Sequence, residues 1–563
     1  MVWEIFNLGY TALNANQYAL NIVGHNIANA DTEGYTRQRA EFVTSTPQYS
    51  VPGMIGTGVL INKIIRVNDA FTQLQLQIET RDLGNSTIKR EILQQLENIF
   101  NEPSDTGLQS RINEFFSAWH TLADNPEDYG TRTLVVEKAN SLTSTLNSMA
   151  RQLAAIKNQI DESISLKIDR INEITTEIAD LNDQISKIEV GGVQNANDFR
   201  DSRDLLVLEL NRILDVRVRE NVSSAILVET QGGVLVSGVH NLRLTTGIDE
   251  NGYIVPVFEQ GGARVFPESG ELNGLLEVRD DVINDYLSRL DSLANTMVEN
   301  VNRIHSRGAP LEMFTRVVAE NGAVSSAQTL NTLDWDFAPT TGSFSISVFD
   351  SNGLNTDVQT ISINPTSDTL EDVRDAINAA FPGGEVVASL NTDNQLIFES
   401  AGGYSFNFVN DSTGAGDSSD LLLALGINTF FSGDSAMTIE VSDNIKSDYS
   451  KISAAKSNSP GDNRTALDIA NLQDSLLFDN DSTTFEDYYK TWVSNIGTLT
   501  YEALRNEDRQ DSIVNLLKER LAQSAGVSLD EEATNLLKHQ RAYQAAAKLI
   551  GVADELLQTL LNL

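Results

Sequence analysis

The chain has 563 residues, no cysteine, and 40 basic against 79 acidic side chains, which gives a formal net charge of −39. This length predicts two to four domains rather than a single core. The acidic balance disfavours binding to nucleic acid or anionic lipid, and the lack of cysteine excludes disulfides, thiolate catalysis and cysteine-based zinc or iron–sulfur sites.

The charge is unevenly distributed along the chain. Residues 1–40 hold three acids and two arginines, residues 528–563 hold five acids and three bases, and residues 311–460 hold twenty acids and five bases. Near-neutral ends and an acidic middle fit a chain whose ends pack against neighbouring subunits while its middle faces water. Ordinary compositional drift would give the same gradient, so both interpretations stay open.

The N-terminus does not read as an ordinary secretory signal. Glu4 stands where positive charge is expected, and the first basic residue is Arg37. No apolar run approaches the ~20 residues that span a bilayer. If the protein leaves the cell, we expect another route of export and no cleaved signal peptide.

Residues 3–28 predict an amphipathic helix with two adjoining apolar stripes, which therefore needs partners on more than one side. The first stripe is Ile5, Leu8, Ala12, Ala15, Ala19 and Ile22, and the second is Phe6, Leu13, Leu20, Val23 and Ile27. Residues 40–66 are punctuated by proline and glycine and predict an extended or β-hairpin segment.

Residues 131–190 contain neither Gly nor Pro, and apolar side chains recur every three or four positions from Leu142 to Ile188. This pattern predicts helix, about 90 Å long if unbroken, and hence a rod-like bundle. Gly191-Gly192 ends the run. A shorter helix follows over 199–214, residues 216–267 alternate with period two and predict a small β segment, and helix returns over 271–306.

Residues 313–440 predict an inserted, mainly β domain with one short helix that starts at a Thr369 cap. The last helix starts at Ser528, where Glu531 suggests a capping box. It continues at alternating four- and three-residue steps with Ala542, Ala546, Leu549, Ala553, Leu556, Leu560 and Leu563. Alone, this helix would expose a long apolar stripe, so we expect the two ends to pair with each other and then with other copies. The alternative packs both ends on the monomer's own core.

The predicted fold class is multidomain α+β with three parts. Residues 1–66 and 522–563 form a terminal α-helical coiled-coil assembly domain. Residues 67–312 and 441–521 form a helical rod domain that contains the β segment 216–267, and residues 313–440 form the β-rich outer domain.

Motifs for catalysis or metal binding are incomplete. The five histidines have no ligand spacing, and His25 is interpreted as a helix-end residue. Ser453 and Lys456 match SxxK and Ser442-Asp443-Asn444 matches SDN, but the order is reversed from the serine β-lactamases. Asp479-Asn480-Asp481 begins like a calcium loop, but Thr484 and Lys490 stand at the anchor positions. We therefore predict no catalytic, cofactor-binding or metal-ligating residue, and no cofactor.

The segment Asn26-Ile27-Ala28-Asn29-Ala30-Asp31-Thr32-Glu33-Gly34-Tyr35 resembles the signature N-x-A-N-x-x-T-x-G-Y of the bacterial flagellar axial proteins, the rod, hook and hook-associated proteins. Residues 526–561 are similar to the C-terminal helix of the hook-associated members, with matches at Asp530, Glu531, Glu532, Gln540, Tyr543, Gln544 and Ala545. Residues 271–282 fit the same family, and 313–440 resembles its inserted domains weakly.

The resemblance implies a structural subunit of the flagellum at the junction between hook and filament, exported unfolded by the flagellar type III apparatus to the outside of the cell. It implies other copies, hook protein and hook-associated protein 3 as partners, and a cytoplasmic export chaperone on the C-terminal helix. The expected assembly interface is Ile5, Leu8, Ala12, Leu13, Ala19, Leu20, Ile22, Val23, Asn26, Ile27, Asn29, Gly34, Tyr35, Leu536, Tyr543, Ala546, Leu549, Ala553, Leu556, Leu560 and Leu563.

Two other functions compete with assembly. In one, the chain is an extracellular adhesin that displays residues 313–440. In the other, it is an enzyme that uses Ser453 and Lys456. The residues of 26–35 themselves favour a joint, because Asn side chains bond to backbone at a helix end, Gly34 permits a turn, and Tyr35 supplies an anchor with one polar tip.

Overall fold

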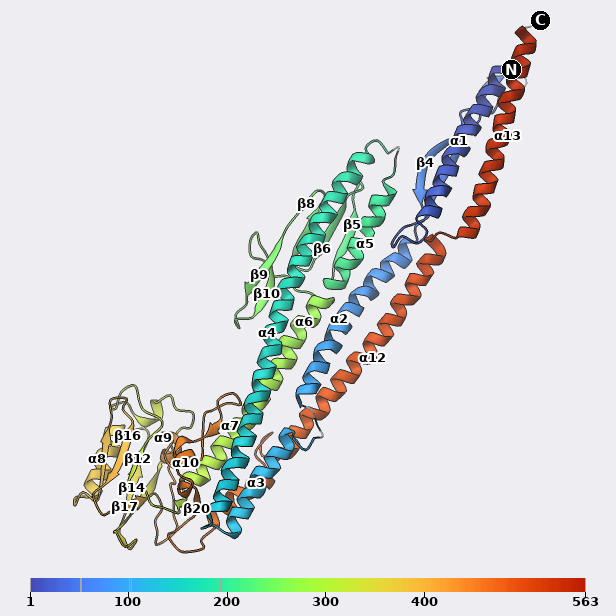
Figure 1. The fold of residues 1–563 in the computed structure, drawn as a ribbon. Helices are drawn as coiled ribbons and strands as arrows, with labels where there is room; N and C mark the ends of the chain where they lie inside the picture. Colours follow the sequence, from blue (N-terminus) through green and yellow to red (C-terminus); the bar gives the residue numbers. More distant parts are fainter. Residues whose placement is uncertain (1, 51–52, 101, 103, 193, 562–563) are drawn as a thin grey trace. The chain divides into compact units, whose positions relative to one another are not determined.

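The computed structural model describes residues 2–50, 53–100, 102, 104–192 and 194–561. The chain divides into two compact units, each built from separate stretches of the sequence. Figure 1 shows the helices and strands, coloured by residue number. The first unit is Met1–Leu93, Asn158–Asp280 and Leu499–Leu563, and the second is Gln94–Lys157 and Asp281–Thr498. The combination of long helices and small sheets confirms the predicted multidomain α+β class.

Three long helices contribute to both units, namely α2 (Ala70–Phe100), α4 (Tyr129–Ile188) and α12 (Phe485–Ala525). The helix predicted over 131–190 is therefore confirmed as a single helix, α4. Gly191 and Gly192 follow it with φ of +87° and +71°, a left-handed conformation that glycine adopts without steric cost, so they end the helix as predicted.

The first unit also contains α1 (Val2–Ala28), α5 (Asn197–Ile213), α6 (Glu271–Glu277) and α13 (Leu529–Leu561), which confirms the predicted helices over 3–28 and 199–214 and the last helix. The sequence analysis placed residues 67–312 in a helical rod domain but identified no individual helix over 70–100. Packing decides its conformation, since Leu76 of α2 lies in one core cluster with Val514 and Leu517 of α12.

The strands of the first unit form small antiparallel sheets. β1 (Gln38–Thr44) pairs with β4 (Val59–Arg66), and β2 (Gln48–Ser50) pairs with β3 (Gly53–Ile55), so residues 38–66 form one hairpin arm as predicted. The β segment over 216–267 is also confirmed. Its strands are β5 (Arg217–Glu220), β6 (Ile226–Thr230), β7 (Gly233–Ser237) and β8 (His240–Asn241) in one sheet, with β9 (Leu244–Ile248) and β10 (Ile254–Phe258) in another.

Two buried asparagines of α4 hold these sheets by imitating a neighbouring strand. The Asn172 side chain donates to the carbonyl of Leu244 and accepts from its amide, both at 2.8 Å. The Asn182 side chain donates to the Ile226 carbonyl at 3.1 Å and accepts from the Ile226 amide at 3.0 Å. Because Leu244 begins β9 and Ile226 begins β6, each asparagine attaches one sheet to the long helix.

The second unit contains α3 (Leu108–Asp124), α7 (Asn284–Ser306), α9 (Leu421–Leu425), α10 (Asp443–Ser447) and α11 (Arg464–Ala470). The helix predicted over 271–306 is not regular throughout, because a π-helical turn, Val278–Ile283, joins α6 to α7. Short strands β11 (Ala309–Pro310) and β20 (Ser453–Ala455) pair with each other, as do β18 (Phe431–Ser432) and β19 (Glu440–Val441).

The remaining strands of the second unit form two three-stranded sheets around one hydrophobic core that extends from Phe314 to Ile427. One sheet is β12 (Arg316–Val318), β16 (Leu396–Ser400) and β15 (Val386–Leu390), and the other is β14 (Asn355–Ile363), β13 (Gly342–Phe349) and β17 (Ser405–Asn407). Helix α8 (Leu370–Ala380) starts with the Thr369 cap expected from the sequence, because Thr369 and Asp372 form a reciprocal capping box.

His305 is fully buried in the second unit and has a fixed protonation state. Its Nδ1 lies 2.7 Å from the carbonyl oxygen of Asn428, and its Nε2 lies 2.8 Å from the backbone nitrogen of Ser453. A carbonyl can only accept and an amide can only donate, so Nδ1 carries the proton and the ring is neutral. Burial lowers the pKa of His305 to about 4.

Because His305 is buried and neutral, we expect the folded protein to lose stability as pH falls. The unfolded chain takes up its proton near the ordinary pKa of about 6.5, whereas the folded chain resists protonation down to about pH 4. The stabilisation is complete above the unfolded pKa and is lost as pH falls between these values, at about 1.4 kcal/mol per pH unit. Urea unfolding followed by tryptophan fluorescence should therefore show a shallower pH slope for His305→Gln than for the natural chain.

His120→Gln is the matched control, because His120 is exposed in the same unit. It should keep the natural slope between pH 6.5 and 4. Equal slopes for the natural chain and His305→Gln would contradict the assignment of the neutral ring.

Candidate assembly interface

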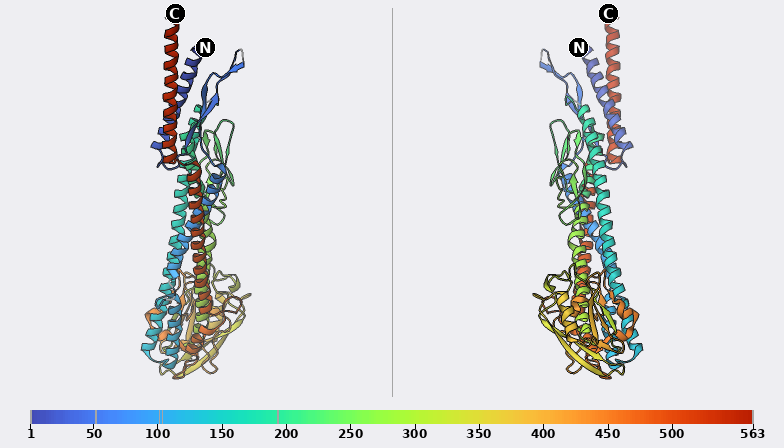
Figure 2. Two further views of the ribbon diagram at one scale, coloured as in Figure 1. Left: turned by 90° about the vertical axis from the view of Figure 1, so that its right-hand side faces the viewer. Right: turned by 90° about the vertical axis from the view of Figure 1, so that its left-hand side faces the viewer.

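The two ends of the chain pair as antiparallel helices. α1 and α13 lie side by side in Figure 1 and in both views of Figure 2, with the termini at the same end. Gly9 lies so close to α13 that a Cβ placed on it would stand 2.8 Å from Cγ1 of Ile550. At the other end of α1, Asn26 contacts Glu532 at the start of α13. The structure thus pairs the termini with each other, as the sequence predicts.

The residues expected at the interface fall into three groups. Buried are Ala19, Ile22, Val23, Asn26, Ala546 and Ala553. Half-buried are Ile5, Ala12, Leu13, Leu20, Asn29, Tyr35, Leu536 and Tyr543, and exposed are Leu8, Ile27, Gly34, Leu549 and Leu556. Leu563 and the side chain of Leu560 lie outside the described residues.

The apolar stripe predicted on the last helix divides between two faces. Ala546 and Ala553 are buried, whereas Leu549 and Leu556 are each 42% exposed. Steps of three and four residues turn an α-helix by about 300° and 400°, so the leucines lie beside the alanine row rather than on it. Small residues therefore occupy the contact within the pair, together with Ile550, which the sequence analysis missed, and the leucines remain outside.

Asn26 uses all four hydrogen-bonding positions of its side chain, and it is 1% exposed. Its Nδ2 donates to the Gln38 carbonyl at 2.9 Å and to Oε2 of Glu532 at 3.0 Å. Its Oδ1 accepts from the Tyr35 hydroxyl at 2.8 Å and from the Gln38 amide at 3.0 Å. One side chain thus joins the end of α1, the following turn, β1 and the start of α13.

Glu532 is a buried carboxylate whose charge Arg37 balances. Nε and Nη2 of Arg37 both lie 2.8 Å from Oε1 of Glu532, and the Arg37 backbone amide donates to the Ala525 carbonyl at the end of α12. Nη1 of Arg37 also binds Glu531 at 2.6 Å. The predicted Ser528–Glu531 capping box is therefore wrong in one half, because the Glu531 carboxylate binds Arg37 while only its amide, at 3.5 Å, approaches the Ser528 hydroxyl.

The turn after α1 has the geometry expected of a joint. Asn29 caps the helix end by donating to the His25 carbonyl at 3.0 Å, and the Tyr35 hydroxyl lies 3.1 Å from Nδ1 of His25. Burial and the nearby carboxylates of α5 raise the pKa of Tyr35, so its hydroxyl stays protonated and can donate. Gly34 has a φ of +74°, and a Cβ there would stand 2.5 Å from the Leu205 side chain, so only glycine fits.

The joint is also attached to α5. The hydroxyl and amide of Thr36 donate to Asp201 at 2.7 and 2.9 Å, and Arg66 at the end of the arm lies 2.8 Å from Asp201 and 2.6 Å from Asp204. Burial raises the pKa of Asp201 despite these bonds, and the two carboxylates raise the pKa of Arg66 despite burial. The joint is therefore held by charge-assisted bonds from three separate chain segments.

The base of the hairpin arm is fixed on the terminal helices. A Cβ on Gly58 would stand 2.1 Å from the Thr11 hydroxyl oxygen of α1, so the strand and the helix are in close contact there. Phe42 of β1 stacks on His539 of α13, with 5.9 Å between ring centroids. The arm therefore starts from the α1–α13 pair.

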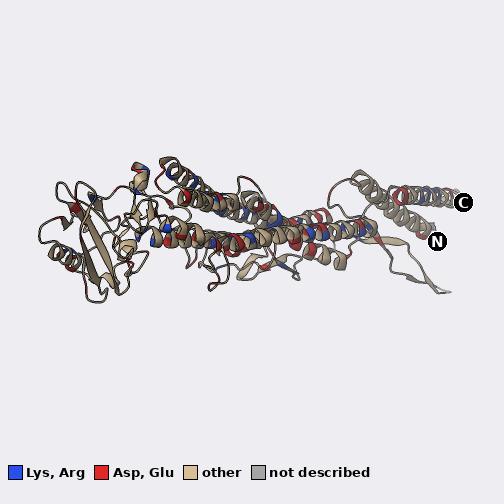
Figure 3. Ribbon diagram, turned by 90° about the horizontal axis from the view of Figure 1, so that it is seen from below, with Lys and Arg blue, Asp and Glu red and all other residues tan. Residues whose placement is uncertain are grey.

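Both helices of the terminal pair expose large apolar side chains. These side chains, each between 37% and 84% accessible, are Trp3, Leu8, Tyr10, Tyr18 and Ile27 on α1, and Leu529, Leu537, Leu549, Val552, Leu556 and Leu561 on α13. Figure 3 shows α1 almost wholly in the colour of uncharged residues, and Glu4 is the one Asp, Glu, Lys or Arg between Val2 and Ala28. So many exposed large apolar side chains on two paired helices favour a protein–protein contact there.

The motifs that suggested an enzyme have structural roles. Ser453 is fully buried and its hydroxyl exchanges hydrogen bonds with the Asn428 side chain at 3.0–3.2 Å, while Lys456 pairs with Asp468. Ser442 is buried and donates to the Thr429 carbonyl at 3.0 Å. The serine and lysine of the SxxK match are therefore engaged by other partners.

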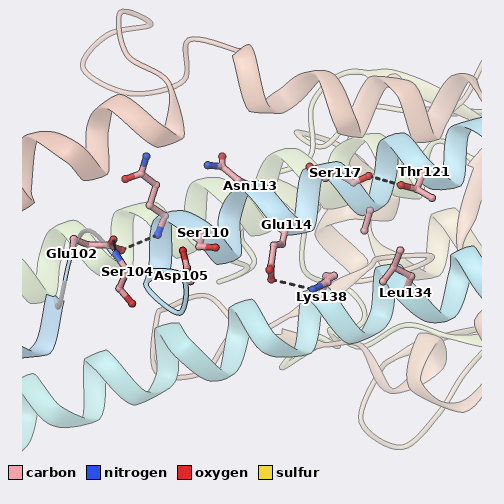
Figure 4. A pocket seen from close by; sticks show the side chains of 12 residues that line it. Glu102, Ser104, Asp105, Ser110, Asn113, Glu114, Ser117, Thr121, Leu134 and Lys138 are labelled. Atoms are coloured by element: carbon pink, nitrogen blue, oxygen red, sulfur yellow. Dashed lines mark hydrogen bonds and ion pairs between the residues drawn. The ribbon is translucent and has the colours of Figure 1, made fainter.

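A polar cavity of about 800 Å³ lies in the second unit (Figure 4). Two of its carboxyl groups contact neighbours: Glu114 lies 3.2 Å from Lys138, and Glu102 accepts from the Ser104 amide at 3.1 Å. These bonds join α3 to α4 and fix the loop before α3. Within the described ranges, the structure has no group of three or more His, Asp or Glu that could hold a metal ion, and no helix long and apolar enough to cross a bilayer.

The central position of Asn26 predicts that Asn26→Ala loosens both ends of the chain. The substitution leaves Glu532 and two backbone groups of Gln38 with fewer partners in a buried site, at a cost of about 2 kcal/mol. Amide hydrogen exchange of the full chain should become roughly thirtyfold faster in α1 and in the first turns of α13.

Asn14→Ala, at an exposed position of the same helix, is the control and should leave exchange nearly unchanged. If Asn26→Ala and the natural chain exchange at the same rate over residues 529–540, Asn26 does not hold the two ends together.

Three known families match parts of the chain. The family described as flagella basal body rod protein matches residues 6–36, and the family described as flagellar basal body rod FlgEFG protein C-terminal matches residues 521–563. The family described as flagellar hook-associated protein FlgK helical domain matches residues 93–314. The two rod families thus cover the paired ends, and the third covers α3, α4 and the helices that follow.

Relatives that match along their whole length share one name. The chain is 28% identical over 572 residues to flagellar hook-associated protein 1 of Salmonella typhimurium, with 100% of both chains covered. It is 25% identical to the Bacillus subtilis protein of that name, over 98% of this chain and 96% of the relative. The structure of the flagellar hook junction protein FlgK from Burkholderia pseudomallei has a similar fold, with a TM-score of 0.51 at 17% identity, covering 81% of this chain and 100% of that one. The chain is thus similar over its full length to relatives named flagellar hook-associated protein 1, and its middle matches the FlgK helical-domain family.

Proposed function

We propose that this chain is a structural subunit of the bacterial flagellum that joins the hook to the filament. Full-length relatives are named as hook-associated proteins, and the ends of the chain match families of axial rod proteins. The observation that carries the proposal is the α1–α13 pair, which is closed by Asn26 and Glu532 on the inside and exposes large apolar side chains on the outside.

The outer faces offer enough apolar surface to drive assembly only when several copies meet. Covering the exposed part of one leucine or aromatic side chain contributes about 1 kcal/mol, so the eleven exposed side chains offer on the order of 10 kcal/mol. Association costs about 4–15 kcal/mol in lost freedom of motion. The two terms are of similar size, so a subunit should add stably to an existing end, where it touches more than one neighbour, rather than form pairs in solution.

The partners follow from this role. The chain assembles with other components of the flagellum, and the specific contacts belong to the proposal: other copies of itself, hook protein on one side and hook-associated protein 3 on the other. An export chaperone would cover the C-terminal helix before secretion, since that helix carries Leu549 and Leu556 on its outer face. The final location is the outside of the cell, at the hook–filament junction.

The role predicts the phenotype of cells that lack the chain. Electron microscopy should show hooks without filaments, and flagellin should appear in the medium. The full chain should restore filaments. A chain that ends at residue 528 should not, although circular dichroism should show that its middle remains folded.

Normal filaments in cells that carry only the shortened chain would contradict the assembly role of the last helix. Deleting residues 313–440 separates the adhesin hypothesis from the structural one. Loss of attachment with full motility would favour the adhesin hypothesis.

Substitution of the outer leucines of α13 tests more specifically whether this face contacts neighbouring subunits. Leu549→Glu with Leu556→Glu places two charges on the outer face and leaves the buried Ala546 and Ala553 in place. Losing the burial of two leucines costs about 2 kcal/mol per subunit, roughly thirtyfold in an association constant. Flagella isolated from cells with this variant should contain correspondingly less of the chain, by quantitative immunoblotting.

Lys548→Glu is the matched control, because it changes the net charge by the same amount at an exposed position of the same helix. It should assemble normally. Equal incorporation of the double leucine variant would show that this face does not contact neighbouring subunits.

A further inference from the structure

The tip of the hairpin arm is an uncharged segment that exposes several apolar side chains on an acidic protein. Residues 44–58 contain no Asp, Glu, Lys or Arg, whereas 21% of the whole chain is charged. Tyr49 is 84% exposed, Met54 67% and Ile55 43%. These side chains are therefore uncovered within the described part of the molecule.

The arm cannot cover its own tip. Its base is attached to α1 through the close approach of Gly58 to Thr11 and to α13 through the stacking of Phe42 on His539. Beyond this base, β2 and β3 form a two-stranded ribbon of three residues each, and isolated ribbons of this kind are marginally stable in water. The tip therefore needs a surface from outside its own chain.

A groove of suitable chemistry lies along α5 in the first unit. Two adjoining cavities of about 790 and 360 Å³ share Glu33, Leu205, Leu208 and Lys518 in their lining. The leucines of α5 are half-buried there, with Leu83 and Leu181 beside them, so the floor is apolar. The rim is mostly acidic, with Glu177, Asp180 and Glu209 against Arg212 and Lys518.

The acidic rim of the groove favours an uncharged segment as its occupant. Copies with a net charge of −39 repel one another, and an acidic segment would be repelled again by the groove's rim. The tip of the arm approaches that rim without charge repulsion, brings apolar side chains to the leucine floor, and carries a Tyr49 hydroxyl that can donate to a rim carboxylate. The arm is also continuous with the α1–α13 pair that the proposed function places between subunits.

We propose that the arm tip of one copy inserts into the α5 groove of an adjacent copy. This inference rests on the proposed function, because it supplies a contact between neighbouring subunits of the junction. An arm-to-groove contact is head-to-tail, and contacts of this type generate rings or helical layers rather than closed dimers. It therefore adds an interaction that the outer faces of α1 and α13 do not provide.

The chain has no cysteine, so introduced thiols report this contact without background. The variant Met54→Cys with Ser202→Cys places one thiol on the arm tip and one in the groove, where Ser202 is exposed. Intact flagella from cells that carry this variant are treated with a short bismaleimide crosslinker and examined by denaturing electrophoresis and mass spectrometry. Each chain has one arm and one groove, so we expect a ladder at multiples of the chain mass, with Met54 and Ser202 positions linked between chains.

Either single variant should give no ladder. Three results overturn the proposal: no ladder from flagella that contain the double variant, a link to a protein of different mass, or a link confined to one chain. Immunoblotting of the same flagella reports junction membership separately, so failure of the arm contact and failure of the proposed function are distinguishable.

A second measurement covers the case in which the double variant is not incorporated. Met54→Glu adds a charge to the tip that the acidic rim repels, and should lower the amount of chain in flagella at least tenfold, whereas Met54→Leu should leave it unchanged. Normal incorporation of Met54→Glu also overturns the proposal.

Discussion

The terminal region depends on one buried charge. Glu532 opens the last helix with a carboxylate that is shielded from water, and its partners, Arg37 and Asn26, come from the opposite end of the chain. A buried carboxylate without its cation is strongly destabilising, so neither end can adopt this arrangement without the other. The turn with Gly34 and Tyr35, the contact of Thr36 with α5 and the direction of the arm all follow from where residues 26–38 are held.

Much of this could be predicted from local pattern, and the remainder depends on partners far apart in the sequence. The lack of Gly and Pro over residues 131–190, the period-two segment after α5 and the Thr369 cap of α8 each identify an element by themselves. The residues of the 26–35 segment also indicated a joint. Periodicity identifies an apolar stripe but not which neighbour covers it, so the division of the last helix between Ala546 and Leu549 was not foreseen. The Arg37–Glu532 pair spans nearly the whole chain, and no local signal reveals it.

The inner and outer faces of the α1–α13 pair differ, and this difference lets the same two helices pair with each other and also contact other subunits. Glycine and alanine bring α1 and α13 close together, so the pair itself uses few large side chains. The leucines and aromatic residues that would ordinarily form a core then remain available on the outside. A nearly uncharged α1 in a strongly acidic protein lets such surfaces meet, because the repulsion carried by the rest of the chain is weakest there.

The two asparagines of α4 have a consequence for how the protein can vary between organisms. Asn172 and Asn182 of the same helix bind the first residues of β9 and β6. The number of residues between the two asparagines therefore sets the distance between the points at which the two sheets are attached. Gain or loss of one residue in that interval would rotate one asparagine by about 100° away from its strand. Relatives should therefore tolerate changes of length in the loops of residues 313–440 far more readily than a single insertion between these two positions.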